Sequence, residues 1–350
     1  MSVFAKKRIM KENQFFISIC IPSYNRPSGL KRLLESIDSK EHVNDIQIVI
    51  CEDNAPKRIE IKAVVDGYLT DSPYAVKYVE NHVNYGHGKN WRECSTQADG
   101  EFLIYMGDDD DFIPGALDPF INWIKDHSEL GYILRAYRGI DQNGKIENHK
   151  YYRQDMFFEP GEKAYTELFF KSVFMSGFTI KKDYVTEYTE DCLDSTLYFQ
   201  LYLQAEVCLK YPSGYCNIPI AQFIGDGVSF FGTNEAEKSF FTPGKRIDFL
   251  YENIDNHFKV TRYIDEKYNL NSTSKIKIEW SKYSSYPTML KQRFLGIKQL
   301  KNAAKELRLL GLDGSKYFNV YYVGLFLFGA KFCAFLVKAI KKVYGSRLKL

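Results

Sequence analysis

The sequence lacks the short glycine signatures of several common binding sites. After the first apolar run, Pro22–Gly29 carries none of the closely spaced glycines of a dinucleotide-binding loop. Neither a Gly-x-x-x-x-Gly-Lys-Ser nor a Gly-x-Ser-x-Gly pattern occurs. An EF-hand loop starting at Asp108 fails as well, because Ile113 and Pro119 stand where glycine and glutamate are required. These absences exclude four frequent kinds of ligand or catalytic site.

The sequence also has little of what marks a secreted or disulfide-rich protein. Its seven cysteines are an odd number, widely spaced and without a Cys-x-x-Cys pair, which fits neither a disulfide framework nor a zinc ribbon. Several stand inside apolar runs, where a reduced thiol behaves as a small buried hydrophobe. Residues 1–15 hold several charges and no apolar core, so they do not resemble a secretory signal. We therefore expect a reducing, cytoplasmic setting.

An excess of charge of one sign is missing too. The 47 Lys and Arg against 44 Asp and Glu give a formal net charge of +3 over 350 residues. Nucleic-acid binders rely on many basic side chains facing phosphates, so we expect no nucleic-acid partner. With 45% apolar and 26% charged residues, the chain has the composition of an ordinary folded protein of about two domains.

What the sequence does contain is an alternation of strand-like and helix-like segments. The strand-like runs are β-branched or aromatic and apolar on both faces: 16–21, 46–51, 76–79 and 102–106. Between them lie stretches long enough for crossover helices: 30–37, 59–68 and 89–98. This rhythm predicts an α/β fold with a mostly parallel sheet covered on both faces.

The middle of the chain is less regular. We expect further strands at 131–137, 174–180 and 218–224, and a helix at 197–209. Pro212–Gly214 reads as a turn before the last of these strands. From residue 243 onward, apolar side chains recur with helical spacing.

Polar segments follow three of the predicted strands. They are Pro22–Pro27, Glu52–Pro56 and Gly107–Asp111, and the last contains four consecutive aspartates. In a parallel sheet, ligands bind beyond the carboxyl ends of the strands, where these segments should converge. Adjacent carboxylates raise one another's pKa unless a cation neutralises them, and oxygen ligands suit Mg²⁺ or Mn²⁺. The alternative is a solvated acidic turn that caps the following helix.

Four segments, taken in order, resemble the nucleotide-sugar glycosyltransferases of family 2. They are Ile17–Pro27, Ile48–Asn54, Asn84–Asn90 and Ala98–Gly115. The resemblance is dense up to residue 115 and looser up to residue 210. It implies the GT-A fold, a Rossmann-like mostly parallel sheet with helices on both faces. It also implies an inverting transfer of a sugar from a nucleoside-diphosphate sugar, with Mn²⁺ or Mg²⁺ as cofactor.

The resemblance also implies roles for residues near the nucleotide. Pro22 and Tyr24 would line its pocket, and Glu52 or Asp53 would bind the base or the ribose.

A second group would meet the diphosphate. Lys89, followed by Asn90, stands where many relatives have an arginine near the diphosphate. The metal would be held by the cluster Asp108, Asp109 and Asp110. Counting back from the following proline favours Asp109 as the main ligand, whereas the literal Asp-x-Asp spacing favours Asp108 and Asp110, and both readings remain open.

A carboxylate away from the metal would serve as general base toward the acceptor hydroxyl. By resemblance to the usual Glu-Asp followed by two residues and a leucine, Asp194 has this role, although Leu193 replaces the glutamate. Asp191 is the second candidate. The alternative for Asp194 is a helix N-cap, a position that aspartate favours.

The carboxyl-terminal stretch is apolar and basic. Phe318–Val337 is as long as a membrane span but contains Lys331, which costs a spanning helix roughly 2.5–3.5 kcal/mol. Five basic residues and no acidic one follow. We expect a helix lying at the membrane surface, with the apolar side in the lipid and the basic end on anionic head groups. A spanning helix and a helix buried against the domain remain alternatives.

These expectations combine into a domain plan and a function. Residues 1–240 would form the glycosyltransferase domain, with a donor half at 15–115 and an acceptor half at 116–240. A helical region, 241–315, and a basic membrane-associating tail, 316–350, would follow. The acceptor would be a glycan or lipid-linked oligosaccharide of bacterial capsule, O-antigen or exopolysaccharide synthesis, at the inner face of the cell membrane. A sugar nucleotidyltransferase and a non-catalytic scaffold of the same fold are the alternatives.

Overall fold

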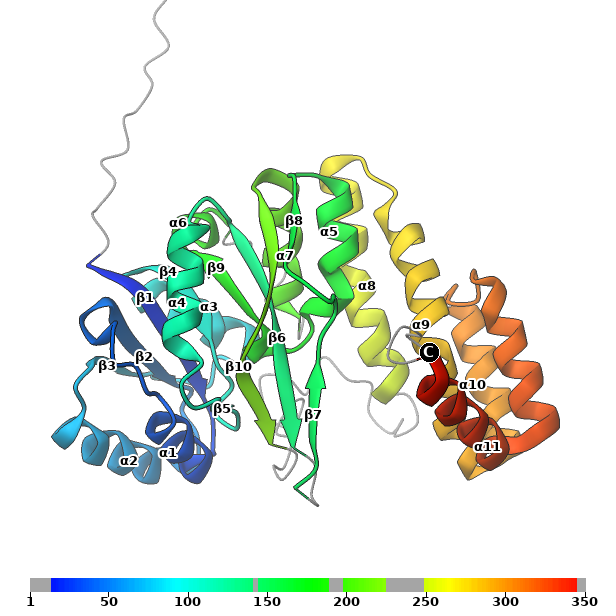
Figure 1. Cartoon of the computed structure of the whole chain (residues 1–350), viewed down its shortest axis with the longest axis horizontal. Coiled ribbons are helices and arrows are strands. Elements are labelled where there is room, and N and C mark those ends of the chain that lie inside the picture. The colour runs from blue at the N-terminus through cyan, green and yellow to red at the C-terminus, as the bar shows by residue number, and fades with distance from the viewer. Residues whose placement is uncertain (1–13, 141–143, 189–197, 225–248, 345–350) are drawn as a thin grey trace, which may run out of the picture. The chain divides into compact units, whose positions relative to one another are not determined.

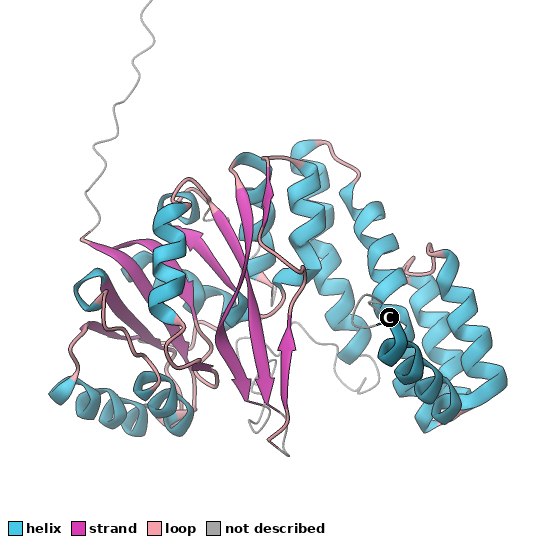
Figure 2. Cartoon of the chain, in the orientation of Figure 1, coloured by secondary structure: helices cyan, strands magenta, loops and turns pink. Residues whose placement is uncertain are grey.

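The chain folds into two compact units, Met1–Phe240 and Phe241–Leu350. The computed structural model describes residues 14–140, 144–188, 198–224 and 249–344. Within these residues all strands belong to the first unit, whereas the second unit is helical (Figures 1 and 2).

The first unit is built on a ten-stranded sheet with the order β3-β2-β1-β4-β9-β6-β10-β5, in which β7 pairs with β6 and β8 with β10. Its strands are β1 Phe15–Ser23, β2 Ile46–Glu52, β3 Ala75–Glu80, β4 Gly100–Tyr105, β5 Asp111–Phe112, β6 Tyr132–Ile140, β7 Ile146–His149, β8 Met156–Phe158, β9 Phe178–Lys181 and β10 Ser213–Ile224. The pairs among β1 to β4 are parallel, and β9 is antiparallel to both β4 and β6. The predicted parallel sheet is therefore confirmed for the donor half.

Helices cover both faces of this sheet. They are α1 Pro27–Glu35, α2 Arg58–Asp71, α3 His87–Gln97, α4 Leu117–Asp126, α5 Glu162–Leu168, α6 Lys182–Val185 and α7 Phe199–Lys210, with short 3₁₀ turns at Val43–Asp45, Phe169–Ser172 and Met175–Gly177. Alternate residues of β1, such as Ile19, pack in one core with α1, α2 and α4. The opposite face meets α3, where Trp91 stacks on Tyr105 at 3.9 Å between ring centroids.

Two of the sequence predictions were wrong at their boundaries. Pro212–Gly214 is not a turn, because β10 already begins at Ser213 and pairs there with both β6 and β8. A Cβ on Gly214 would lie 2.7 Å from the Leu130 side chain, so the glycine allows close packing inside the sheet. The strand predicted at 174–180 begins only at Phe178, since Met175–Gly177 forms a 3₁₀ turn. That turn carries a residue of the site.

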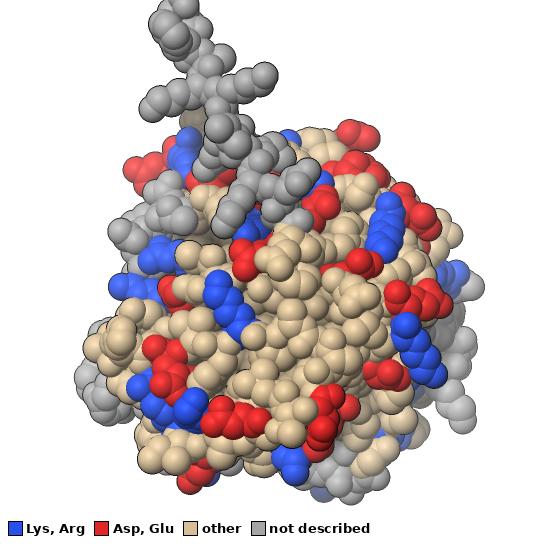
Figure 3. All heavy atoms as spheres, turned by 90° about the vertical axis from the view of Figure 1, so that its left-hand side faces the viewer, with Lys and Arg blue, Asp and Glu red and all other residues tan. Residues whose placement is uncertain are grey.

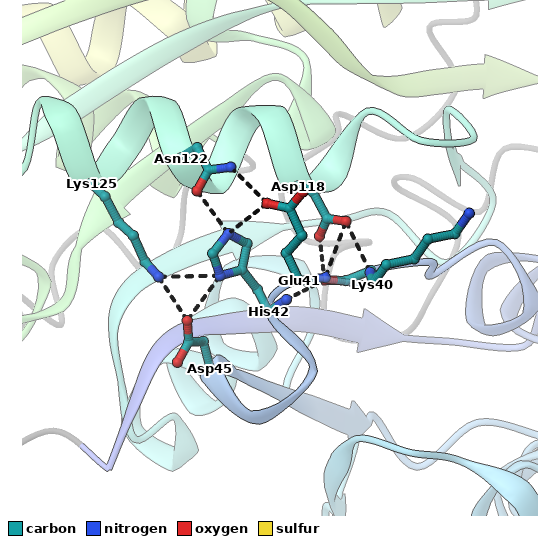
Figure 4. Close-up of polar contacts among 8 residues, drawn as sticks. Lys40, Glu41, His42, Asp45, Asp118, Asn122 and Lys125 are labelled. Atoms are coloured by element: carbon teal, nitrogen blue, oxygen red, sulfur yellow. Dashed lines mark hydrogen bonds and ion pairs between the residues drawn. The ribbon is translucent and has the colours of Figure 1, made fainter.

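A polar network fixes α4, the helix that follows the acidic segment, to the connection between α1 and β2 (Figure 4). His42 Nε2 lies 2.9 Å from Asn122 Oδ1, and Lys125 Nζ donates to Asp45 Oδ2 at 2.8 Å. The backbone N–H of Lys40 donates to Asp118 at 2.9 Å. This network holds the connection between α1 and β2 against α4.

The described cysteines are free and buried, as expected for reduced thiols: Cys20, Cys51, Cys94, Cys208, Cys216 and Cys333. On the face shown in Figure 3, which looks onto the left side of Figure 1, Lys and Arg side chains alternate with Asp and Glu. Charge of one sign does not gather on that face.

The second unit consists of α8 Phe249–Tyr268, α9 Ser272–Leu295, α10 Ile297–Leu309 and α11 Lys316–Tyr344. Helix α11, the predicted tail, packs against α9. The rings of Tyr286 and Tyr321 lie 5.4 Å apart, and the Tyr321 hydroxyl donates to the Lys282 carbonyl at 3.3 Å.

Candidate active site

The four aspartates lie beyond the carboxyl end of β4, directly beside the loop that follows β1. The backbone N–H of Met106 donates to the Cys20 carbonyl at 3.0 Å, which continues the pairing of the two strands up to the acidic segment. The end of β2 joins the same edge, because the Asp53 N–H donates to the Ser23 carbonyl at 3.0 Å. The predicted convergence of these three segments is therefore confirmed.

Asp108 ties the acidic segment to the loop after β1. Its carboxylate accepts hydrogen bonds from Ser23 Oγ at 3.1 Å, from the Tyr24 N–H at 2.9 Å and from Arg26 Nη1 at 2.9 Å. The side chain is buried. Burial raises the pKa of Asp108 to about 6, while the Arg26 charge counteracts part of that effect. Both carboxylate oxygens of Asp108 therefore accept hydrogen bonds from the loop after β1.

Asp111, at the start of β5, pairs with a side chain of α1. Arg32 Nε contacts both of its carboxylate oxygens, at 2.8 and 3.1 Å. The same guanidinium donates through Nη2 to the Asp109 carbonyl at 2.7 Å. Asp111 therefore belongs to an ion pair that holds the acidic segment against α1.

Asp109 and Asp110 each bring one carboxylate oxygen close to Gly107. A Cβ built on Gly107 would lie 3.0 Å from Asp109 Oδ1 and 3.3 Å from Asp110 Oδ2. The Asp109 side chain keeps 32% of its surface exposed and lies 3.3 Å from Arg26 Nη2. Asp110 is buried, and its Oδ2 accepts a hydrogen bond from Ser176 Oγ.

The second oxygen of Asp110, Oδ1, is buried and has no hydrogen-bond donor among the described residues. Burial, helped by the negative charge of Asp109, raises the pKa of Asp110 to about 8. A buried carboxylate oxygen without a donor disfavours the ionised form, and a nearby cation reverses that preference. The donor set is therefore suited to a hard divalent cation.

No group of three His, Cys, Asp or Glu side chains within the described part of the chain is arranged to hold a metal ion. The chain would accordingly offer two carboxylates, Asp109 and Asp110. Mg²⁺ and Mn²⁺ sites in nucleotide enzymes are commonly built in this way, with phosphates and water completing the shell. The fit to such an ion is good if a ligand carries the remaining oxygens.

The carboxylates predicted to bind the base or the ribose are engaged within the protein. Asp53 is buried and accepts four hydrogen bonds, from Asn81 Nδ2 and Asn84 Nδ2, each at 3.0 Å, and from the N–H groups of Tyr85 and Gly86, at 2.8 and 2.9 Å. Burial raises the pKa of Asp53 to about 6. These bonds shape the loop that leads into α3.

Glu52 is also fully buried, and its two oxygens accept from the Ala55 N–H and from Arg58 Nε. Arg58 in turn donates to the Asn81 carbonyl. The carboxylate therefore joins the end of β2 to the start of α2 and to the loop after β3. Its role toward a nucleotide stays a prediction.

The other predicted binding residues lie around the same edge. Pro22 and Tyr24 are half-buried at the end of β1, and Lys89 is exposed in the first turn of α3. Asn90 is buried, donates to the Cys51 carbonyl and accepts from Asn81 Nδ2, each at 2.9 Å. Lys89 is thus open to solvent, whereas Asn90 ties the first turn of α3 to the end of β2 and to the loop after β3. Asp191 and Asp194, the predicted bases, lie outside the described residues.

Two residues of this site were missed by the sequence analysis. Ser176 Oγ donates to Asp110 and accepts from the Gly107 N–H at 2.8 Å. Arg135, fully buried on β6, donates to the Ser176 carbonyl at 2.9 Å, and burial lowers its pKa to about 9. An arginine inside the apolar run 132–136 was the one available signal, whereas nothing in the sequence marks Ser176.

Gly29→Ala is expected to disturb the acidic segment through its backbone. A Cβ on Gly29 would lie 2.4 Å from the Asp108 carbonyl oxygen, which cannot move aside as a flexible side chain would. We expect a loss of about 1–3 kcal/mol in the free energy of unfolding, measured with urea. Gly67→Ala in α2 is the matched control, since no atom lies within 4 Å of its Cβ. It should gain about 0.5–1 kcal/mol. Equal effects of the two substitutions would contradict this packing.

The stability of the metal-free protein should depend on Asp110 ionisation. Its pKa is raised from 3.8 to about 8 in the folded state, so its contribution is full below pH 4 and is lost as pH rises through 8. One pKa unit corresponds to about 1.4 kcal/mol. Between pH 5 and 8, wild type should therefore lose at least about 2 kcal/mol relative to Asp110→Asn, as measured by urea unfolding with a chelator present. Parallel pH curves for the two proteins would argue against the buried, unpaired carboxyl.

Comparison with known proteins identifies similar sequences. Residues 18–185 match the family model described as glycosyl transferase family 2. Abequosyltransferase RfbV of Salmonella typhimurium is 29% identical over 126 residues, which are 36% of this chain and 37% of that protein. The GalNAc(5)-diNAcBac-PP-undecaprenol beta-1,3-glucosyltransferase of Campylobacter jejuni is 32% identical over 103 residues, 29% of this chain and 32% of that protein. The chain thus matches about a third of the length of these relatives.

Solved structures show the same fold. S. aureus TarS 1–349 in complex with UDP-GlcNAc has a TM-score of 0.52 at 14% identity, covering 85% of this chain and 92% of that chain. At this identity the likeness concerns the fold alone. The predicted GT-A type of α/β fold, followed by a helical carboxyl-terminal region, is confirmed.

Proposed function

Because residues 18–185 belong to glycosyl transferase family 2, we propose that this chain is an inverting glycosyltransferase. It moves one sugar from a nucleoside-diphosphate sugar to a hydroxyl group of a glycan or lipid-linked oligosaccharide. The observation that carries the proposal is the pair Asp109 and Asp110 at the carboxyl edge of the parallel strands, with one buried Asp110 oxygen left without a donor among the described residues.

The donor side of the proposal rests on this edge. Asp109 and Asp110 would hold a divalent cation, which would supply a Lewis acid for the departing diphosphate. Arg26 orients Asp108 and Asp109, and Ser176 holds Asp110. Lys89 and the amino end of α3 offer positive charge on the solvent side. A nucleotide-sugar donor is further supported by TarS, a protein of the same fold that has been captured with UDP-GlcNAc.

The acceptor side rests on resemblance. Asp194, or else Asp191, takes the proton of the attacking hydroxyl, and attack opposite to the departing diphosphate inverts the anomeric carbon. The two relatives named above are an abequosyltransferase and a glucosyltransferase acting on an undecaprenol-linked oligosaccharide. We place this chain in the synthesis of a bacterial surface polysaccharide, on the cytoplasmic side of the membrane.

The proposal is tested by incubating the full chain with a panel of UDP-, dTDP-, GDP- and CDP-sugars, with Mn²⁺ or with a chelator. We expect slow metal-dependent release of nucleoside diphosphate from one donor through transfer to water. Thermal-shift measurements with the free diphosphates identify the base, since a specific ligand stabilises the fold. Release of pyrophosphate from a nucleoside triphosphate would point to a nucleotidyltransferase instead. Absence of both binding and turnover with all donors would overturn the proposal.

A further inference from the structure

Helix α11 is long and apolar enough to span a membrane but is broken in the middle. Lys316–Ile340 meets the length and composition of a span, and only 17% of its most apolar window is buried. At Gly329, however, φ is 77° and ψ is 169°, which are not helical values. The ribbon changes direction within α11 (Figure 1).

The two parts of α11 fold back on each other. Cys333 Sγ contacts the Gly324 carbonyl oxygen at 3.3 Å. In a straight helix these residues would be separated by about 13.5 Å along the axis, at 1.5 Å per residue. The segments 316–328 and 330–344 are about 20 and 22 Å long, whereas a bilayer core is about 30 Å thick. Neither segment spans it.

The break adjoins the junction of α9 and α10. Arg293 Nε donates to the Leu325 carbonyl at 3.0 Å, and its Nη2 would lie 3.6 Å from a Cβ on Gly329. The last carbonyls before a helix break lack helical donors, so this guanidinium satisfies one of them. Arg293 thereby joins the end of α9 to the bend of α11.

Large apolar side chains are exposed around this junction. At the α9–α10 junction, Phe294 and Leu295 keep 56% and 68% of their surface exposed, and at the bend Leu327 and Phe328 keep 65% and 62%. We call the whole set the apolar corner: Phe294, Leu295, Ile297, Phe326, Leu327, Phe328 and Phe332. Scattered exposed apolar residues are ordinary, but a gathered set marks an interaction surface.

The charges around the apolar corner are basic. Lys298 and Lys301 on α10 and Lys331 on α11 are exposed, and Lys301 Nζ lies 5.5 Å above the ring of Phe326. No Asp or Glu occurs between residues 314 and 350. An apolar centre with a lysine rim complements anionic lipid, whose acyl boundary accepts the rings while its head groups meet the ammonium groups.

We propose that the apolar corner inserts into one leaflet of an anionic membrane as a bent wedge, without crossing it. This deepens the membrane association proposed above and rests on that proposal, but not on the transferase chemistry. The bend at Gly329 presents Leu327 and Phe328 to the lipid, and Arg293 keeps the α9–α10 junction in register with them. Both ends of α11 remain on the same side of the bilayer.

Flotation of the full chain with vesicles tests the wedge. Wild type should float with vesicles of one part phosphatidylglycerol to three parts phosphatidylcholine, and at least about tenfold less with pure phosphatidylcholine or in high salt. Leu327→Glu with Phe328→Glu should reduce flotation at least about tenfold. Ile59→Glu is the matched control, because Ile59 is 84% exposed in the other unit, and it should float as wild type does. Arg293→Gln, which loosens the bend, should weaken flotation to an intermediate degree.

Further readouts separate the possible failures. Donor hydrolysis by the double variant should equal that of wild type. Loss of flotation with retained hydrolysis therefore supports the wedge. Absence of hydrolysis in a wild type that floats would count against the proposed function but not against the wedge. A tag after residue 350 should remain open to protease outside the vesicles, and its protection would indicate a spanning helix and overturn the wedge. Unchanged flotation of the double variant would also overturn the wedge. So would a wild type that binds no lipid but sediments as a dimer, if the double variant sediments as a monomer.

Discussion

Asp110→Asn is expected to reduce sugar transfer by at least about 10³-fold. The substitution keeps the size of the side chain and an oxygen that can accept the Ser176 hydroxyl, but it removes the negative charge that would hold a divalent cation. Stabilisation of the diphosphate charge is among the largest contributions to such a reaction. Initial rates with a saturating donor and Mn²⁺, together with Mn²⁺ affinity from calorimetry, measure the effect.

Asp111→Asn is the matched control for this loss. Asp111 is adjacent in sequence, but its carboxylate is engaged by Arg32. It should lower the stability of the fold, because it breaks the ion pair with Arg32, while leaving Mn²⁺ affinity within about threefold of wild type, because Asp111 is not one of the proposed cation ligands. If Asp110→Asn retained both Mn²⁺ affinity and turnover, the cation would have to be assigned elsewhere.

Asp194→Asn is expected to lower kcat by about 10²–10⁴-fold, because asparagine cannot take the proton of the acceptor hydroxyl. Donor KM and Mn²⁺ affinity should stay close to wild type, since the base acts on the acceptor. The acid limb of the pH–rate profile should disappear with the carboxylate. Rates across pH 5–9 at a saturating donor concentration provide the measurement.

Asparagine also separates this role from a helix N-cap, because it caps a helix about as well as aspartate does. A purely structural Asp194 would therefore leave kcat nearly unchanged in Asp194→Asn and lose stability only in Asp194→Ala. Asp191→Asn is measured in parallel. A large kcat loss there, with little loss in Asp194→Asn, would transfer the base role to Asp191.

The fold of the donor half could be predicted from the sequence because its hydrophobic pattern is compatible with few arrangements of strands and helices. Apolar runs of strand length that alternate with helical stretches have few solutions other than a covered parallel sheet, and β1 to β4 follow them within a few residues. The acidic segment was recognisable for the same reason, since four adjacent carboxylates are costly without partners.

What could not be predicted is how those carboxylates divide. Asp108 and Asp111 pair with Arg26 and Arg32, which are separated from them in sequence by the strands β2, β3 and β4 and the helices α2 and α3. Ser176 reaches Asp110 only because a 3₁₀ turn precedes β9, and no local pattern marks that turn. The acceptor half contains short antiparallel strands such as β7 and β8, and strands this short give only a weak hydrophobic periodicity in the sequence.

The four hydrogen bonds on Asp53 have a practical consequence for engineering donor preference. A substitution there removes the anchor of the loop before α3, so a variant selected for a new nucleotide would first have to rebuild that loop. Lys89 is exposed in the first turn of α3. A library that varies Lys89 and keeps Glu52, Asp53 and Asn81 constant would therefore change the proposed donor site while keeping the hydrogen bonds of Asp53.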